Sequence, residues 1–208
     1  MPEYLPTTDF INFISSQTTS KMRRVLELTA CLAIVISTGC HRPKAFEIRG
    51  KVTNASGRMI YLEELLVNSV RPVDSAKINS GGEFVLKEHT GMPTFYLLKL
   101  AENNFITLLI DSAEKVTIEA DAINFARDYL VDGSPGSLLV QELNNKLNTT
   151  KQKLDSINSL YTIYEGSPDI EQLKKEWGEA YHEIVQEQVD YSTNFVMEHP
   201  FSMANVLA

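Results

Sequence analysis

The sequence predicts a mainly β chain with α structure at its C-terminal end: an antiparallel β-sandwich-like domain followed by an α-helical hairpin. Two observations carry this prediction. From Phe46 onward, apolar and polar residues alternate, and turn-forming residues recur roughly every ten positions, as in short antiparallel strands. After Gly133 the apolar residues recur at spacings of three and four, which is typical of amphipathic helices.

Eight short segments are expected to form the strands of the β domain, which we bound at residues 45–132. They are 46–52, 59–65, 73–78, 83–86, 94–100, 105–110, 115–119 and 128–131. Asn54–Gly57 and Asn79–Gly82 have the composition of tight turns. The fifth and sixth segments are the most apolar, so we expect them at the centre of the domain.

Residues 133–199 are predicted to form a two-helix linker. Apolar residues from Leu138 to Tyr161 mark the first helix. Ser167 is expected to cap the second helix, with Pro168 at its first position. The apolar stripe between Trp177 and Phe195 is expected to pack against the first helix.

Residues 200–208 read as the opening of a further helix. Ser202 is expected to cap it, because a serine hydroxyl can accept a hydrogen bond from a free backbone N–H at a helix start. We therefore expect that the natural chain continues beyond Ala208.

A short segment near the N-terminus has the features of an export signal. Arg23 and Arg24 precede a mostly apolar run at 25–36, and small residues then lead to Cys40. A basic start, a short apolar run and small residues at the cut are the parts of a secretory signal. The segment resembles a bacterial lipobox, which implies cleavage after Gly39 and acylation of Cys40, for example with palmitate.

This interpretation assigns residues 1–39 to an upstream extension and signal peptide and residues 40–45 to a tether. A plain transmembrane helix is disfavoured because it needs about 20 apolar residues, whereas secretion without a lipid stays open. Cys31 would be removed with the signal. The mature chain would then contain no free thiol and no disulfide.

The charge of the chain limits its partners. The 208 residues have a formal net charge of −8. Nucleic acid requires a basic face, so no nucleic-acid partner is expected. An acidic chain is also repelled by an anionic leaflet, so a lipid anchor has to hold it at the membrane. Stable anchoring needs more than one acyl chain.

Several short motifs resemble a known family of domains. They are Phe46–Gly50, Ile60–Leu62, Val73–Ala76, Gly82–Phe84, Pro93–Tyr96, Ile110-Asp111 and Gly133-Ser134. In order and spacing they resemble the β-rich domain of unknown function DUF 4369 of bacterial lipoproteins. The resemblance implies a helical linker and then a thioredoxin-like domain of the thiol–disulfide oxidoreductase or peroxiredoxin type. The Cys-x-x-Cys or peroxidatic Cys of such a domain does not occur in these 208 residues.

No catalytic residue, no metal ligand and no cofactor is predicted. Glu179 and His182 have the spacing of di-iron carboxylate bundles, but the sequence lacks the second copy, so a solvated helix face is favoured. The segment 133–137 could bind an anion at a helix start, although a tight strand-to-helix turn explains its glycines better.

A second candidate ligand site consists of aromatic residues in the strands, Tyr61, Phe95, Tyr96 and Phe105. Tyr61 and Tyr96 are the two that we expect to be exposed, and together they would form a face for a glycan or peptide. The alternative is that they pack in the core or as cross-strand pairs, as aromatics in strands commonly do.

The sequence therefore favours a non-catalytic accessory module of a membrane-anchored lipoprotein. We expect it to face the periplasm from the bacterial cell envelope, with the outer membrane favoured over the inner. It would position a thioredoxin-like domain or another periplasmic protein. The alternatives are a stand-alone glycan- or peptide-binding module and, less favoured, an enzyme within the β domain.

Overall fold

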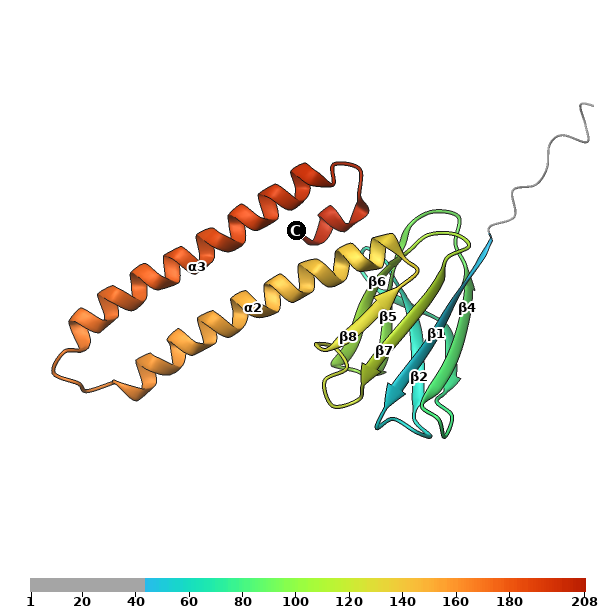
Figure 1. Cartoon of the computed structure of the whole chain (residues 1–208), viewed down its shortest axis with the longest axis horizontal. Coiled ribbons are helices and arrows are strands. Elements are labelled where there is room, and N and C mark those ends of the chain that lie inside the picture. Colours follow the sequence, from blue (N-terminus) through green and yellow to red (C-terminus); the bar gives the residue numbers. More distant parts are fainter. Residues whose placement is uncertain (1–43) are drawn as a thin grey trace, which may run out of the picture. The chain divides into compact units, whose positions relative to one another are not determined.

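The computed structural model describes residues 44–208, so the predictions for Cys31, Gly39 and Cys40 lie outside the described residues. Eight strands are followed by two long helices and a short 3-10 helix (Figure 1). The strands are β1 (Ala45–Thr53), β2 (Met59–Leu65), β3 (Val70–Lys77), β4 (Glu83–His89), β5 (Thr94–Ala101), β6 (Asn104–Ile110), β7 (Lys115–Asp121) and β8 (Tyr129–Asp132). The helices are α2 (Pro135–Ile163), α3 (Ile170–Glu198) and the 3-10 helix η1 (Met203–Leu207). The predicted fold class is confirmed.

The strands form two four-stranded sheets that pack as a sandwich. One sheet has the order β4-β1-β7-β8 and the other the order β3-β2-β5-β6. All of the described pairs are antiparallel except β1 with β7, which is parallel and places Ile48 beside Val116. The strongly apolar β5 is an inner strand of its sheet, as predicted, whereas β6 is an edge strand.

The core of the sandwich follows from the period-two alternation. In β1, Phe46, Ile48 and Val52 are buried, while Glu47 and Arg49 between them point outward. Gly50 continues the inward series, and the ring of Phe84 occupies the space where a Cβ would stand. Burial of apolar area contributes about 25 cal/mol per Å², so this alternation is the main source of stability in the domain.

The two long helices form the predicted hairpin. Their apolar stripe is half-buried, and Trp177 meets Tyr161 edge to face with 4.9 Å between ring centroids. Figure 1 shows α2 and α3 running beside each other. The prediction that the stripe packs against the first helix is therefore confirmed. Within residues 44–208, no helix has an apolar stretch long enough to cross a membrane.

Of the two predicted helix caps after α2, the structure contradicts that of Ser167 and confirms that of Ser202. Ser167 is not the cap of α3: the cap residue is Asp169, without a side-chain hydrogen bond, and the helix begins at Ile170. Ser167 instead lies in the preceding turn, where its C=O accepts from the N–H of Ile170. Ser202 does act as a cap, since its side chain accepts from Ala204 N, but the helix that follows is of the 3-10 type.

Candidate functional site

The predicted ligand face does not form as expected. Tyr61 is 46% exposed on the outer face of its sheet, but Tyr96 is only 2% exposed and packs on Phe46 with a ring-centroid distance of 5.0 Å. The prediction that Tyr96 is exposed is wrong. Register explains why: β2 and β5 pair Tyr61 with Lys99, three positions from Tyr96 along β5, and side chains at odd separations point to opposite faces. Burial raises the pKa of the Tyr96 hydroxyl.

The second exposed aromatic of this face is Phe105. Lys99 pairs with Tyr61 on one side and with Phe105 on the other, so the three residues form a row across β2, β5 and β6. Phe105 is 38% exposed. Lys99 Nζ lies 2.9 Å from Glu102 Oε2 and 3.1 Å from Glu63 Oε2, and these hydrogen bonds, that of Glu102 first, raise the pKa of Lys99. In this row, two exposed aromatic rings flank a lysine whose charge is balanced by two glutamates.

A buried polar joint connects α2 to the edge of the sandwich. Ser134 and Ser137 are both fully buried, and each hydroxyl lies 3.1 Å from the carbonyl oxygen of Leu109 on β6. Leu109 N in turn donates to Ser137 Oγ at 3.1 Å. Because β6 is an edge strand, its free backbone groups need partners, and the two serines supply them at Leu109.

The same hydrogen-bonded residues decide between the two interpretations of residues 133–137, an anion-binding helix start and a tight strand-to-helix turn. The Ser134 side chain accepts from Ser137 N, so it is the N-cap of α2. Gly133 has φ +76°, and a Cβ there would overlap the carbonyl oxygen of Lys115. A Cβ on Gly136 would lie 2.6 Å from Leu109 O. The glycines therefore serve a tight strand-to-helix turn, and the helix start is occupied by protein groups.

Around the joint, α2 closes the open side of the sandwich between β6 and β8. The Gln141 amide donates to Tyr129 O of β8, while Val140 and Leu143 pack on Leu109 of β6. The end of α3 and the 3-10 helix complete this second apolar cluster with Phe195 and Ala204. The first turns of the hairpin are thus fixed to β6 by an apolar core and to β8 by a hydrogen bond.

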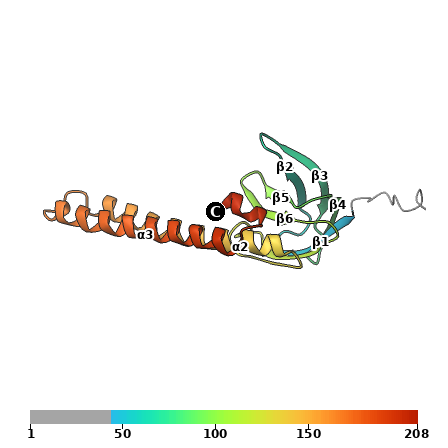
Figure 2. The ribbon, with the colours of Figure 1, turned by 90° about the horizontal axis from the view of Figure 1, so that it is seen from above.

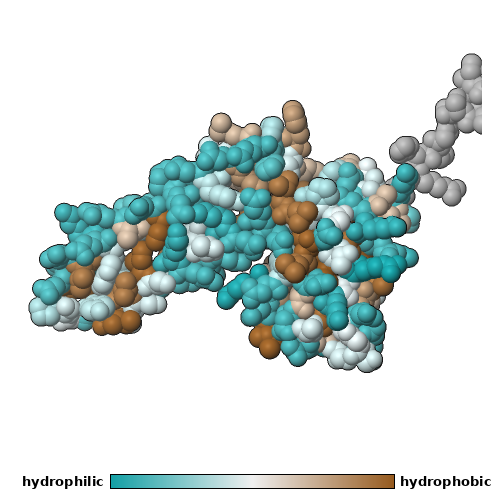
Figure 3. Space-filling model, in the orientation of Figure 1, coloured by the Kyte–Doolittle hydropathy of each residue, from teal (hydrophilic) through white to brown (hydrophobic). Residues whose placement is uncertain are grey.

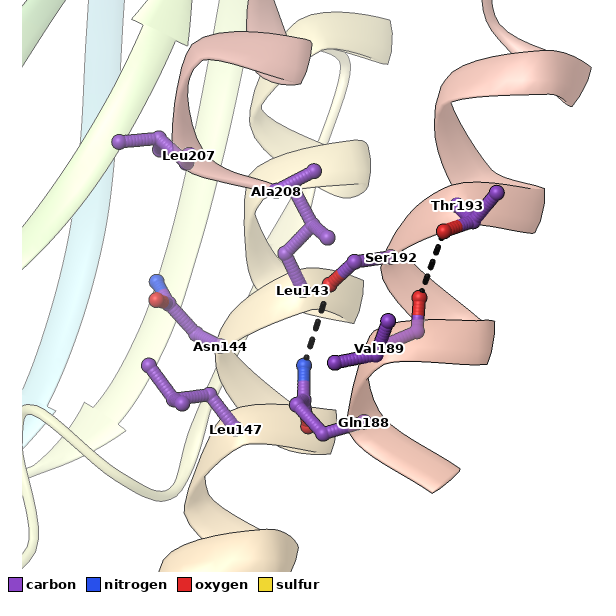
Figure 4. Close-up of a pocket in the computed structure, with 9 residues that line it drawn as sticks. All are labelled: Leu143, Asn144, Leu147, Gln188, Val189, Ser192, Thr193, Leu207 and Ala208. Carbon is purple, nitrogen blue, oxygen red and sulfur yellow. Dashed lines mark hydrogen bonds between the residues drawn. The ribbon is translucent and has the colours of Figure 1, made fainter. Parts of the chain in front are cut away.

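A groove lies between α2, α3 and the C-terminal residues (Figure 4). Its volume is about 420 Å³, and it is lined by Leu143, Asn144, Leu147, Gln188, Val189, Ser192, Thr193, Leu207 and Ala208. Gln188 donates to Ser192 and accepts from Thr150, and Thr193 donates to the carbonyl of Val189. No lining side chain is a titratable acid or base. The groove offers apolar and amide groups for binding, and no proton-transferring group.

Ion pairs hold the two helices together beside this groove. Lys146 and Lys153 of α2 reach the Glu187 carboxylate of α3 at 2.5 and 2.7 Å. Hydrogen bonds from Lys146 and then Lys153 lower the pKa of Glu187 to about 2. Burial, and a hydrogen bond to Glu142, raise the pKa of Tyr191 to about 12.

The acidic and histidine side chains do not gather into a site. Within residues 44–208, no group of three or more His, Cys, Asp or Glu side chains is placed to hold a metal ion. Glu179 and His182 are both exposed on α3, in agreement with the prediction that they belong to a solvated helix face. The surface in Figure 3 is hydrophilic over much of the face it shows, with separate apolar patches on the helices and on the sandwich.

The fold and these surfaces define a two-sheet β domain whose open side is closed by a helical extension. Residues 46–139 match the model of the family described as "Domain of unknown function (DUF4369)". The resemblance inferred from the motifs is thereby confirmed. The matched segment ends within the first turns of α2 and so includes Ser134 and Ser137. Searches of curated proteins and of solved structures found no match to the chain.

Proposed function

We propose that this chain is a non-catalytic accessory module of a lipid-anchored lipoprotein in the bacterial cell envelope. In this proposal Cys40 carries the lipid after cleavage at Gly39, and the module faces the periplasm, on the outer membrane in preference to the inner. Its task is to position a thioredoxin-like redox domain. The anchor is supported by the basic, apolar and small-residue order of residues 23–40.

The observation that carries the positioning role is the joint of Ser134 and Ser137 with Leu109. A spacer positions another domain only if its own attachment is fixed, and here buried hydrogen bonds and a small apolar core fix the base of α2. The chain then returns along α3, and Phe195 and Ala204 pack in one cluster with Leu109, so the residues that follow the hairpin begin beside the joint. A domain attached there would start from a fixed base.

The groove of α2 and α3 is the surface that we propose for contact with the redox domain. Leu147, Val189 and Leu207 are 42–54% exposed along it, and its lining carries no charged side chain. An apolar, uncharged lining suits burial against another protein surface. Leu147→Asn should weaken cross-linking between hairpin and redox domain in the native protein. The matched control is Leu130→Asn, on the outer face of the sandwich.

The intact mass of the native protein, extracted from its membrane, tests the proposal. We expect a chain that begins at an acylated Cys40, is substantially heavier than Cys40–Ala208, and contains a reducible cysteine pair. A mass equal to acylated Cys40–Ala208 would contradict the positioning role. A mass without acyl groups would contradict the anchor.

The row of Tyr61, Lys99 and Phe105 favours a second candidate function, a stand-alone glycan- or peptide-binding module. Its two aromatic rings are separated by one strand, so they lie about 10 Å apart along the sheet. Tyr61→Ala and Phe105→Ala should each abolish binding to a glycan or peptide array, whereas Tyr181→Ala on α3 should not. No binding by the native protein would exclude this candidate.

A further inference from the structure

The strand registers define which loops lie at the end of the sandwich where the tether enters. Ala45, the first residue of β1, pairs with His89, the last residue of β4. The β2–β3, β4–β5 and β6–β7 loops therefore share the end at which the chain arrives from residue 40. The β1–β2, β3–β4, β5–β6 and β7–β8 loops lie at the opposite end.

The β2–β3 hairpin reaches beyond β4 at the tether end. Lys87 N donates to Asp74 Oδ2 at 2.8 Å, so Asp74 lies level with Lys87. From that level β4 runs two more residues to His89, whereas β3 extends four residues back to Val70, with a turn beyond it. Figure 2 shows this hairpin projecting from the sandwich.

The tip of this hairpin is apolar and exposed. Leu65, Leu66 and Val70 are 39–44% exposed, and Val67 is 99% exposed. In the described loops of the opposite end, Ile123 is the one large apolar side chain that is exposed. The two ends of the sandwich therefore differ in character, although both consist of short connections.

Val67 departs from ordinary turn chemistry, whereas Asn68 and Ser69 conform to it. Leu66 N donates to Ser69 O at 2.9 Å, which leaves Val67 and Asn68 at the apex. Gly, Pro, Asn, Asp and Ser dominate such positions, whereas the fully exposed valine contributes nothing to the core. A departure from local preference without a folding benefit is expected at functional positions.

The tip is also electrically neutral. Residues 65–70 carry no charged side chain, and the first charged residues on the two strands, Glu64 and Arg71, are hydrogen-bonded to each other. A chain with a net charge of −8 is repelled by an anionic leaflet. This tip can approach such a leaflet without that penalty, and without placing an unpaired charge in it.

We propose that the Leu65–Val70 tip inserts into the surface of the phospholipid bilayer that holds the anchor. The inference rests on the proposed acylation of Cys40. Ala45 is the fifth residue after Cys40, a reach of at most about 18 Å, so the tether end of the sandwich lies close to the bilayer. The tip is mainly aliphatic and contains no Trp, Tyr or Arg, the residues that dominate protein–protein hot spots. Anchor and tip together give two attachments, which fix the orientation of the sandwich on the membrane.

Fluorescence quenching in the acylated full chain tests this inference. Val67→Cys, in a Cys31→Ser background, is labelled with an environment-sensitive fluorophore and reconstituted in vesicles of phosphatidylethanolamine and phosphatidylglycerol. Nitroxide lipids that quench near the headgroup region should reduce the emission at residue 67 by about twofold or more, since interfacial segments sit about 5–10 Å deep. The matched control, Ile123→Cys at the opposite end, should not be quenched.

Each other outcome overturns the inference and shows which step failed. Protein that floats with the vesicles but is unquenched at residue 67 keeps its anchor and lacks the inserted tip. Emission that shifts to the blue without nitroxide quenching means that another protein surface, such as a second copy, covers the tip. Protein that fails to float contradicts the proposed anchor itself.

Discussion

Ser137 and Leu109 exchange two hydrogen bonds across the boundary between helix and sheet. Leu109 N donates to Ser137 Oγ, and Ser137 Oγ can donate back to Leu109 O, each at 3.1 Å. The Ser137 hydroxyl thus provides Leu109 with the hydrogen bonds that a neighbouring strand would make. Leu109 lies on the edge strand β6 and has no strand on that side. The helical hairpin is for this reason a continuation of the β domain, with no flexible linker between them.

The first prediction concerns this exchange. Ser137→Ala should lower the free energy of unfolding by about 1–3 kcal/mol, because it leaves the buried N–H of Leu109 without its partner. Chemical denaturation measures the loss. The matched control is Ser156→Ala, whose exposed hydroxyl bonds only to the carbonyl of Gln152 one turn back, and it should change stability by less than about 0.5 kcal/mol. Equal effects would contradict the role of the joint.

The second prediction compares two glycines. Gly133→Ala should destabilise the protein by about 2 kcal/mol or more, since φ is +76° and the new Cβ would overlap the Lys115 carbonyl. Gly178→Ala, in α3 with no atom within 4 Å of a Cβ, should stabilise it by about 1 kcal/mol. Thermal unfolding of both variants measures the two shifts. A neutral Gly133→Ala would mean that the turn adopts another conformation.

The third prediction separates the two tyrosines of the expected ligand face. Tyr96→Ala removes a core ring and should cost about 3–5 kcal/mol. Tyr61→Ala removes an exposed ring and should cost about 0.5 kcal/mol or less. Denaturant titration of the two variants distinguishes them, and similar losses would contradict the register of β2 with β5.

The strands were predictable because their alternation is local. Each of the eight predicted segments overlaps one observed strand, and Met59–Leu65 coincides with β2. A half-buried strand shows its inner and outer face in its own sequence. The pairing of β1 with β7 was not visible in this way, since the paired residues are 68 positions apart and carry no shared local signal.

The predicted ligand face shows where prediction from the sequence of a single strand fails. The exposure of Tyr61 follows from alternation in β2, but the place of Tyr96 depends on which residue of β5 faces which residue of β2. A shift of one residue moves a side chain to the other face. Similarly, Gly133, Ser134 and Ser137 could be recognised as a turn and a cap, whereas their partner Leu109 could be found only from the packed structure.

The last prediction is a pH dependence of the helical hairpin. Lys146 and Lys153 lower the pKa of Glu187 from 4.5 to about 2, so the native state favours the ionised carboxylate. The stabilisation is therefore present above the unfolded pKa of about 4.5 and is lost as the pH falls from there to about 2.

Glu187→Gln isolates this contribution. The variant should unfold at a lower temperature than the parent at pH 6, and the difference should shrink toward pH 2, because the native carboxyl is about half protonated there. Thermal unfolding followed by circular dichroism across this range measures it. Glu183→Gln, at an exposed position of the same helix, is the matched control and should track the parent. A difference at residue 187 that is as large at pH 2 as at pH 6 would mean that Glu187 stabilises the hairpin by packing and not through its charge.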